Sequence, residues 1–97
     1  MVKLIEIYET TNVHSNEVEK RFSLRETFLN PDHVVCVRED LTFKQKLQAG
    51  EMPKDLDSRQ RFSKIYMDRG HTGIDIVVVG TPEQVYDVLS TKKVLKG

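Results

Sequence analysis

Residues 62–84 read FSKIYMDRGHTGIDIVVVGTPEQ and predict a β-hairpin that runs directly into a helix. Apolar and polar residues alternate in the first part, two glycines follow within 69–73, and a run rich in β-branched residues comes after them. This pattern is typical of two antiparallel strands joined by a tight turn. The sequence therefore predicts strands over 62–68 and 74–79, and Gly80 allows the sharp change of direction that a following helix needs.

The helix after this hairpin has a complete start signal. Thr81 is the expected N-cap, Pro82 occupies the first helical position, and Gln84 closes a capping box with Thr81. We expect the helix to end near Ser90 and residues 91–97 to form a frayed tail. The predicted apolar face consists of Val85, Val88 and Leu89, with Tyr86 at one edge.

The N-terminal part of the chain predicts three further strands. Residues 2–9 are rich in β-branched residues and favour a strand buried on both faces, whereas 21–29 alternates and favours a half-buried strand. The polar segment 10–20 between them is typical of an exposed loop. Residues 30–32 (Asn-Pro-Asp) predict a turn, and 34–38 shows no alternation, which predicts a strand covered on both sides, at the centre of a sheet or beneath a helix.

Residues 39–61 form a long charged insertion between the predicted strands. A short helix is expected over 42–49, because Phe43 and Leu47 share one helical side and Gly50 follows as a stop signal. Its candidate N-caps are Asp40 and Thr42. The remainder has no sustained period and favours an irregular loop, a kind of segment that frequently binds partners.

These elements together predict an α+β fold: a mainly antiparallel sheet of about five strands, with one C-terminal helix packed on it and a long charged loop insertion. A chain of 97 residues has room for one hydrophobic core, so residues 1–97 are expected to form a single domain. An open sheet leaves an edge that must be covered or paired. We therefore expect a homodimer that forms through this edge.

Composition argues against several classes of protein. The chain has 15 Lys and Arg residues and 15 Asp and Glu residues, so its net charge is zero. A protein that coats nucleic acid usually carries an excess of positive charge. Cys36 is the only cysteine, which favours the cytoplasm over an oxidising compartment, and its valine neighbours predict that it is buried in the core. No apolar run approaches the roughly 20 residues that a membrane span needs, so no membrane role is expected.

Catalytic and metal-binding patterns are not recognisable in the sequence. His14, His33 and His71 lack the spacing of a metal site, and Asp55 and Asp57 suit a solvated loop better than a cation site. The glycines near His71 join two strands and do not open a helix, unlike those of a phosphate-binding loop. We therefore expect no enzymatic activity, no metal and no cofactor.

One charge cluster suggests a nucleic-acid interface. Basic side chains can contact phosphates, and an aromatic ring between them can stack on a base. The candidate residues are Arg59, Arg61, Lys64, Tyr66 and Arg69. In the alternative interpretation Phe62 packs in the core and the cations pair with acids of the insertion, namely Glu39, Asp40, Asp55 and Asp57.

Three functions stay open on the sequence. The leading hypothesis is a non-catalytic interaction or regulatory module that acts as a homo-oligomer and docks a protein partner through residues 39–61. This hypothesis predicts that deletion of residues 41–58 abolishes capture of the partner and preserves the fold. The alternatives are a nucleic-acid-binding protein that uses the basic and aromatic cluster, and a small metal-dependent hydrolase or nuclease built on His33 or His71 with loop carboxylates.

Three short stretches resemble a known family. They are the start Met1-Val2-Lys3-Leu4, residues 28–35 (FLNPDHVV) and the closing hairpin that runs into residues 81–85 (TPEQV), and together they are similar to the small FlbD-like proteins of flagellar operons. The resemblance implies an N-terminal strand, an Asn-Pro-Asp-like turn and a final strand followed by a short helix. The chain also resembles uncharacterised small proteins of tailed phages. Neither resemblance brings a known active site.

Overall fold

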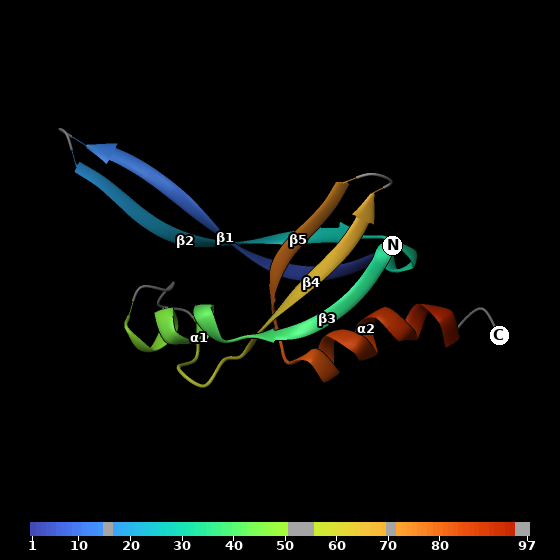
Figure 1. The fold of residues 1–97 in the computed structure, drawn as a ribbon. Coiled ribbons are helices and arrows are strands. Elements are labelled where there is room, and N and C mark those ends of the chain that lie inside the picture. Colours follow the sequence, from blue (N-terminus) through green and yellow to red (C-terminus); the bar gives the residue numbers. More distant parts are fainter. Residues whose placement is uncertain (15–16, 51–55, 70–71, 95–97) are drawn as a thin grey trace.

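The computed structural model of the chain describes residues 1–14, 17–50, 56–69 and 72–94. Within these residues the fold is α+β, with a five-stranded antiparallel sheet in the order β2-β1-β5-β4-β3 and two α-helices (Figure 1). The elements are β1 (Val2–His14), β2 (Glu17–Leu29), a 3-10 turn (Pro31–His33), β3 (Val34–Asp40), α1 (Leu41–Gln48), β4 (Phe62–Arg69), β5 (Thr72–Val79) and α2 (Pro82–Val94). The predicted class and the antiparallel sheet are confirmed, and the described residues contain a second α-helix beside the predicted C-terminal one.

Each face of the sheet carries a hydrophobic cluster. Val77 and Val78 are neighbours in β5, so their side chains point to opposite faces. The cluster around Val78 consists of Val2, Leu4, Leu29, Ile65, Val78, Val85 and Leu89. The cluster around Val77 consists of Ile7, Phe22, Leu47, Phe62 and Val77. Because Val85 and Leu89 belong to α2 and Leu47 belongs to α1, the two faces are called here the α2 face and the α1 face.

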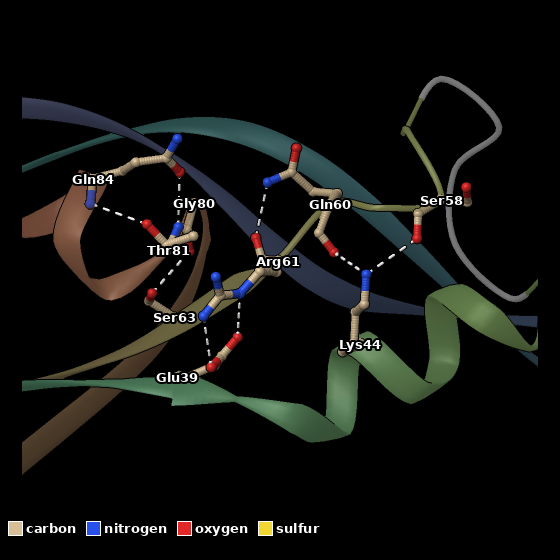
Figure 2. Close-up of polar contacts among 9 residues, drawn as sticks. All are labelled: Glu39, Lys44, Ser58, Gln60, Arg61, Ser63, Gly80, Thr81 and Gln84. Atoms are coloured by element: carbon tan, nitrogen blue, oxygen red, sulfur yellow. Dashed lines mark hydrogen bonds and ion pairs between the residues drawn. The ribbon is translucent and has the colours of Figure 1, made fainter.

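The junction between β5 and α2 forms as predicted. Gly80 has a φ of 128°, a conformation that side-chain-bearing residues rarely adopt. The Thr81 hydroxyl accepts a hydrogen bond from the Gln84 amide at 3.2 Å, and the Thr81 amide donates to the Gln84 side chain at 2.9 Å (Figure 2). The capping box is confirmed. The predicted end at Ser90 is wrong: residues 91–94 contain no glycine or proline, and α2 continues to Val94.

The hairpin of β1 and β2 is much longer than predicted. All 13 residues of β1 pair with β2, so the loop expected over 10–20 is wrong for every described residue in that range. β1 pairs with β5 at Glu6 and Ile7, and the outer half of the hairpin extends away from the rest of the sheet (Figure 1). In a two-stranded ribbon the inward backbone N–H and C=O groups pair across the hairpin and the outward ones can bind water, so the ribbon can form without an apolar face. Its polar sequence therefore resembles that of a loop.

Helix α1 anchors the first part of the insertion to the α1 face. The expected helix is confirmed, with Asp40 as its N-cap: the Asp40 carboxylate accepts a hydrogen bond from the Phe43 amide at 2.9 Å. Leu47 is buried. The Phe43 ring lies 5.5 Å from the ring of Phe22 and 6.2 Å from that of Phe62, measured between centroids. The helix thus covers part of the second hydrophobic cluster.

The end of the insertion is tied to the same helix. Residues 56–61 are irregular, as expected, while 51–55 lie outside the described residues. The Lys44 ammonium group donates hydrogen bonds to the carbonyl oxygens of Ser58 and Gln60, each at 3.1 Å (Figure 2). Both described parts of the insertion are therefore attached to the folded core.

Strand β3 forms as predicted but lies at the edge of the sheet. The expectation of cover on both sides is wrong: 67% of Val35 is exposed, and Cys36, expected in the core, is half-buried. The pairing shifts from Val34 opposite Met67 to Cys36 opposite Tyr66, so Val35 is an extra residue in a β-bulge. An unbroken apolar run indicates a strand, but it does not show whether one or both sides of that strand are covered by other elements.

Candidate functional site

A groove of about 510 Å³ lies between β3 and α2, which runs alongside that strand in Figure 1. Its residues from the 3-10 turn and β3 are Pro31, Val34, Val35, Cys36 and Val37. Its residues from α2 are Pro82, Glu83, Tyr86, Asp87, Leu89 and Ser90. The groove is therefore apolar along the strand, while the helix contributes both apolar and acidic side chains.

Two large apolar side chains of this groove are exposed. Val35 is 67% exposed and Tyr86 is 63% exposed, whereas Leu89 below them is buried against the core. The sequence placed Tyr86 at the edge of the apolar face of the helix, and the structure confirms that it does not contribute to the buried face. An apolar surface that extends beyond the core in this way is typical of an interaction site.

The outer edge of β3 adds a second binding feature. β4 lies on one side of β3, and no strand of the described residues lies on its other side. An edge strand presents unpaired N–H and C=O groups that can accept a further strand. From Cys36 to Asp40 the pairing with β4 is regular, so this part of β3 has the geometry of an ordinary edge strand. β3 therefore contributes both one wall of the groove and this strand edge.

Three of the basic residues in the candidate nucleic-acid interface contact acids. Arg61 donates two hydrogen bonds to Glu39, at 2.6 Å and 2.9 Å, and Figure 2 shows the two side chains facing each other. The guanidinium group of Arg59 binds the carboxylate of Asp57 at 3.1 Å and 3.2 Å. The Lys64 ammonium nitrogen lies 3.9 Å from the Asp40 carboxylate.

These contacts are the ones that the alternative interpretation of the charge cluster requires. Hydrogen bonds from Arg61 lower the pKa of the Glu39 carboxyl, and those from Arg59 lower the pKa of the Asp57 carboxyl, so both acids remain charged beside their cations. Phe62 is fully buried, as the same interpretation expects. Because neighbouring acids offset these cations, the local excess of positive charge is small. Nucleic-acid binding stays a prediction.

The remaining candidates for this interface, Tyr66 and Arg69, both belong to β4. The ring of Tyr66 lies beneath the Arg38 guanidinium, with 5.9 Å between the guanidinium carbon and the ring centroid. Arg69 ends β4, where the backbone alone is described. The structure thus places Lys64 and Tyr66 on the α1 face, as the alternation predicts, whereas Arg59 and Arg61 precede the strand.

The histidine and carboxylate candidates for metal chemistry fall mostly outside the described residues. His71 and Asp55 are not described, and His14 is described by its backbone alone. Within the described chain, no group of three or more His, Cys, Asp and Glu side chains is placed to hold a metal ion. In the same residues, no helix has both the length and the apolar character that crossing a membrane requires.

A partly buried carboxylate lies on the hairpin. Glu6 is 8% exposed and accepts hydrogen bonds from the Arg25 Nε atom at 2.9 Å and from the Thr27 hydroxyl at 2.8 Å. Arg25 also lies over the ring of Tyr8, 4.1 Å from its centroid. Burial alone raises the pKa of the Glu6 carboxyl, but the hydrogen bonds and the charge of Arg25 outweigh it and hold that pKa below its ordinary value.

This arrangement predicts a contribution to stability that depends on pH. Because the pKa of Glu6 is lower in the folded chain than in the unfolded chain, its contribution is present at neutral pH and is lost as the pH falls below about 4.5. We expect Glu6→Gln to lower the free energy of unfolding at pH 7 and to flatten its decline in acid. Urea unfolding between about pH 3 and pH 7 measures both effects.

The matched control is Glu26→Gln, which removes an exposed carboxylate 3.7 Å from the Lys3 ammonium nitrogen. This variant should follow the wild-type pH profile, because exposed ion pairs contribute little to stability. Equal pH profiles for Glu6→Gln and the wild type would contradict the role assigned to Glu6.

The sequence contained a partial signal for the groove. The sequence shows both the apolar run over 34–37 and the aromatic Tyr86 at the edge of a helix, but it does not show that the two lie side by side. The topology brings them together, because β3 lies at the edge of the sheet beside α2. No spacing in the sequence connects two segments so far apart.

Comparison with known proteins adds no family to these observations. No protein-family model matches the chain, and searches of curated proteins and of solved structures find no match. The similarity to FlbD-like and phage proteins therefore stays a prediction. The groove between β3 and α2 is the feature of the described chain from which a function is best argued.

Proposed function

We propose that this chain is a non-catalytic interaction module that takes up an extended segment of a protein partner along the outer edge of β3. The main support for this proposal is the apolar groove between β3 and α2, since β3 is also an edge strand of the sheet. An extended segment added to such an edge gains backbone hydrogen bonds from the strand and side-chain contacts from the groove. This mode of recognition requires no catalytic group and no cofactor.

Two side chains are positioned to contribute most to binding. Val35 and Tyr86 stand on opposite walls of the groove, one on the strand and one on the helix, and both are exposed in the free chain. Covering them would remove apolar surface from water, which is the main driving force for association. A tyrosine also provides a large contact area with few rotatable bonds, so its ordering costs little.

The proposed site differs from the one expected on sequence. Docking through residues 39–61 stays a prediction, and its first two residues, Glu39 and Asp40, already belong to β3. A second copy of this chain is the other candidate occupant of the edge, in agreement with the expected homodimer. We favour a partner segment because the apolar walls of the groove from β3 and α2 offer side-chain contacts beside the strand edge.

The test uses purified chain and a library of random displayed peptides about a dozen residues long. We expect enriched peptides to shift the amide resonances of 34–37 and of α2. Tyr86→Ala should weaken their binding about tenfold, as loss of a central aromatic contact does. Phe28→Ala is the matched control, because Phe28 is 62% exposed, close to the 63% of Tyr86, and lies on β2 outside the groove.

Two outcomes would overturn the proposal. One is a selection that enriches no peptide, or enriches peptides that bind Tyr86→Ala as tightly as the wild type. The other is a dimer, detected by sedimentation velocity, that Val35→Glu dissociates while the matched change Leu41→Glu on α1 does not. That second result would assign the edge to another copy of this chain, since Val35 and Leu41 are similarly exposed.

A further inference from the structure

We propose that the extended segment bound along β3 carries an aspartate or glutamate opposite Arg38 on the α1 face, and apolar residues on the α2 face beside the groove. This inference rests on the proposed function and adds the chemistry of the partner. Val37 packs against the hydrophobic cluster of the α2 face. Arg38 is the next residue of the strand, so its side chain points to the α1 face. Arg38 is exposed, and no strand of the described residues covers the outer side of β3.

The guanidinium group of Arg38 contacts an aromatic ring and not an acid. It lies over the ring of Tyr66, with 5.9 Å between the guanidinium carbon and the ring centroid, and it forms no ion pair with a carboxylate of the described residues. By contrast, a carboxylate binds each of Arg25, Arg59 and Arg61. Contact with a ring leaves the positive charge of a guanidinium group in place. Arg38 is therefore available to an acidic side chain of a partner.

The neighbours of Arg38 on the α1 face do not offset its charge. Lys64, directly opposite on β4, is a second cation. Asp40, two positions along β3, caps α1 and lies 3.9 Å from the Lys64 ammonium nitrogen. Asp68 is four residues farther along β4, and Asp75 belongs to β5, with β4 between it and β3. The group of Arg38, Lys64 and Asp40 therefore carries a net positive charge at the edge of the sheet.

The geometry of strand addition determines where the acidic residue of the partner must lie. Side chains directly opposite each other on paired strands are close enough for opposite charges to attract. Pairing of β3 with β4 is regular from Cys36 to Asp40, so the bulge at Val35 does not disturb the position of Arg38. The partner residues on either side of the acid point to the α2 face, where Val37 and the groove favour apolar side chains. Exposed ion pairs are individually weak, so the acid acts mainly on selectivity, and its effect should decline as the salt concentration rises.

The test uses three capped peptides of the pattern Gly-Thr-Val-X-Val-Thr-Gly, in which X is glutamate, glutamine or lysine. The peptides have the length of β3, and they place X on one face and both valines on the other. The pattern is symmetric, so these faces are the same in either strand direction. Amide chemical shifts of residues 36–40 report binding, and titration gives each dissociation constant. We expect the glutamate peptide to bind about threefold more tightly than its glutamine counterpart, and the lysine peptide to bind most weakly.

A charge reversal in the chain makes the test specific. Arg38→Glu should remove or invert the order of the three peptides, and it should keep the fold because the new carboxylate would lie opposite Lys64. The control Lys3→Glu reverses an exposed cation of the same face on β1, away from the edge strand, and should keep the order. Thermal unfolding of both variants verifies that the fold is retained. Equal binding of the three peptides with shifts at 36–40, or an unchanged order in Arg38→Glu, would overturn this inference and leave the proposed function standing. No shift with any of the three peptides would overturn both.

Discussion

Phe62→Ala is expected to lower the free energy of unfolding by about 3–5 kcal/mol, the range for loss of a buried phenylalanine side chain. Phe62 has no exposed surface, and its ring lies 6.2 Å from that of Phe43 between centroids. It begins β4 and packs on the α1 face with Ile7 and Val77. Alanine would leave a cavity among residues of three strands and α1. Urea unfolding followed by circular dichroism measures the change.

Phe28→Ala provides the matched control for this substitution. The residue type and the sheet are the same, but 62% of Phe28 is exposed and it belongs to neither hydrophobic cluster. Its replacement should change the free energy of unfolding by less than about 0.5 kcal/mol. Similar losses in the two variants would show that Phe62 is not the central residue of the α1 face.

The double variant Phe43→Ala, Leu47→Ala in α1 is expected to lose about 4 kcal/mol of the free energy of unfolding. Leu47 is buried and Phe43 contacts the rings of Phe22 and Phe62, so both contribute to the cover of the α1 face. A domain of this size has a total stability of about 5–15 kcal/mol. The double variant should therefore be unfolded in a substantial fraction or melt at a much lower temperature.

The control for the double variant is Leu41→Ala, Gln45→Ala on the same helix. Both residues are exposed, and alanine keeps the helix propensity. The melting temperature of this control should stay close to that of the wild type. If Phe43→Ala, Leu47→Ala were as stable as the wild type, the fold would not depend on α1. The expectation that the fold survives deletion of residues 41–58 implies this result. The contacts of Phe43 and Leu47 predict the opposite.

Local signals in the sequence identified most elements of the fold. The turn before β3, the hairpin of β4 and β5, the capping box of α2 and the helix over 42–49 all depend on residues near one another in the chain. The two main errors have a common cause. The strands over 10–14 and 17–20 and the last turn of α2 are polar, and periodicity reveals an element only where one of its sides is apolar.

The candidate site was less predictable than the fold. The basic residues near Arg61 were visible in the sequence, and so were the acids that the structure places beside them, but pairing depends on which strands are neighbours. Glu39 and Arg61 are 22 positions apart and meet because β3 pairs with β4. Val35 and Tyr86 are still farther apart in sequence, and both line the groove because β3 lies beside α2.

Local sequence was sufficient to identify most of the segments that form strands and helices and the residues in them that are apolar, because hydrogen bonding, turn chemistry and side-chain alternation act over a few residues. The tertiary structure alone decided that β3 is an edge strand and that α2 lies beside it, because strand order depends on contacts between distant segments. A valine run such as 34–37 is compatible with a central strand and with an exposed edge. Whether it is buried or free to bind is a property of its neighbours, and these are fixed only when the sheet has assembled.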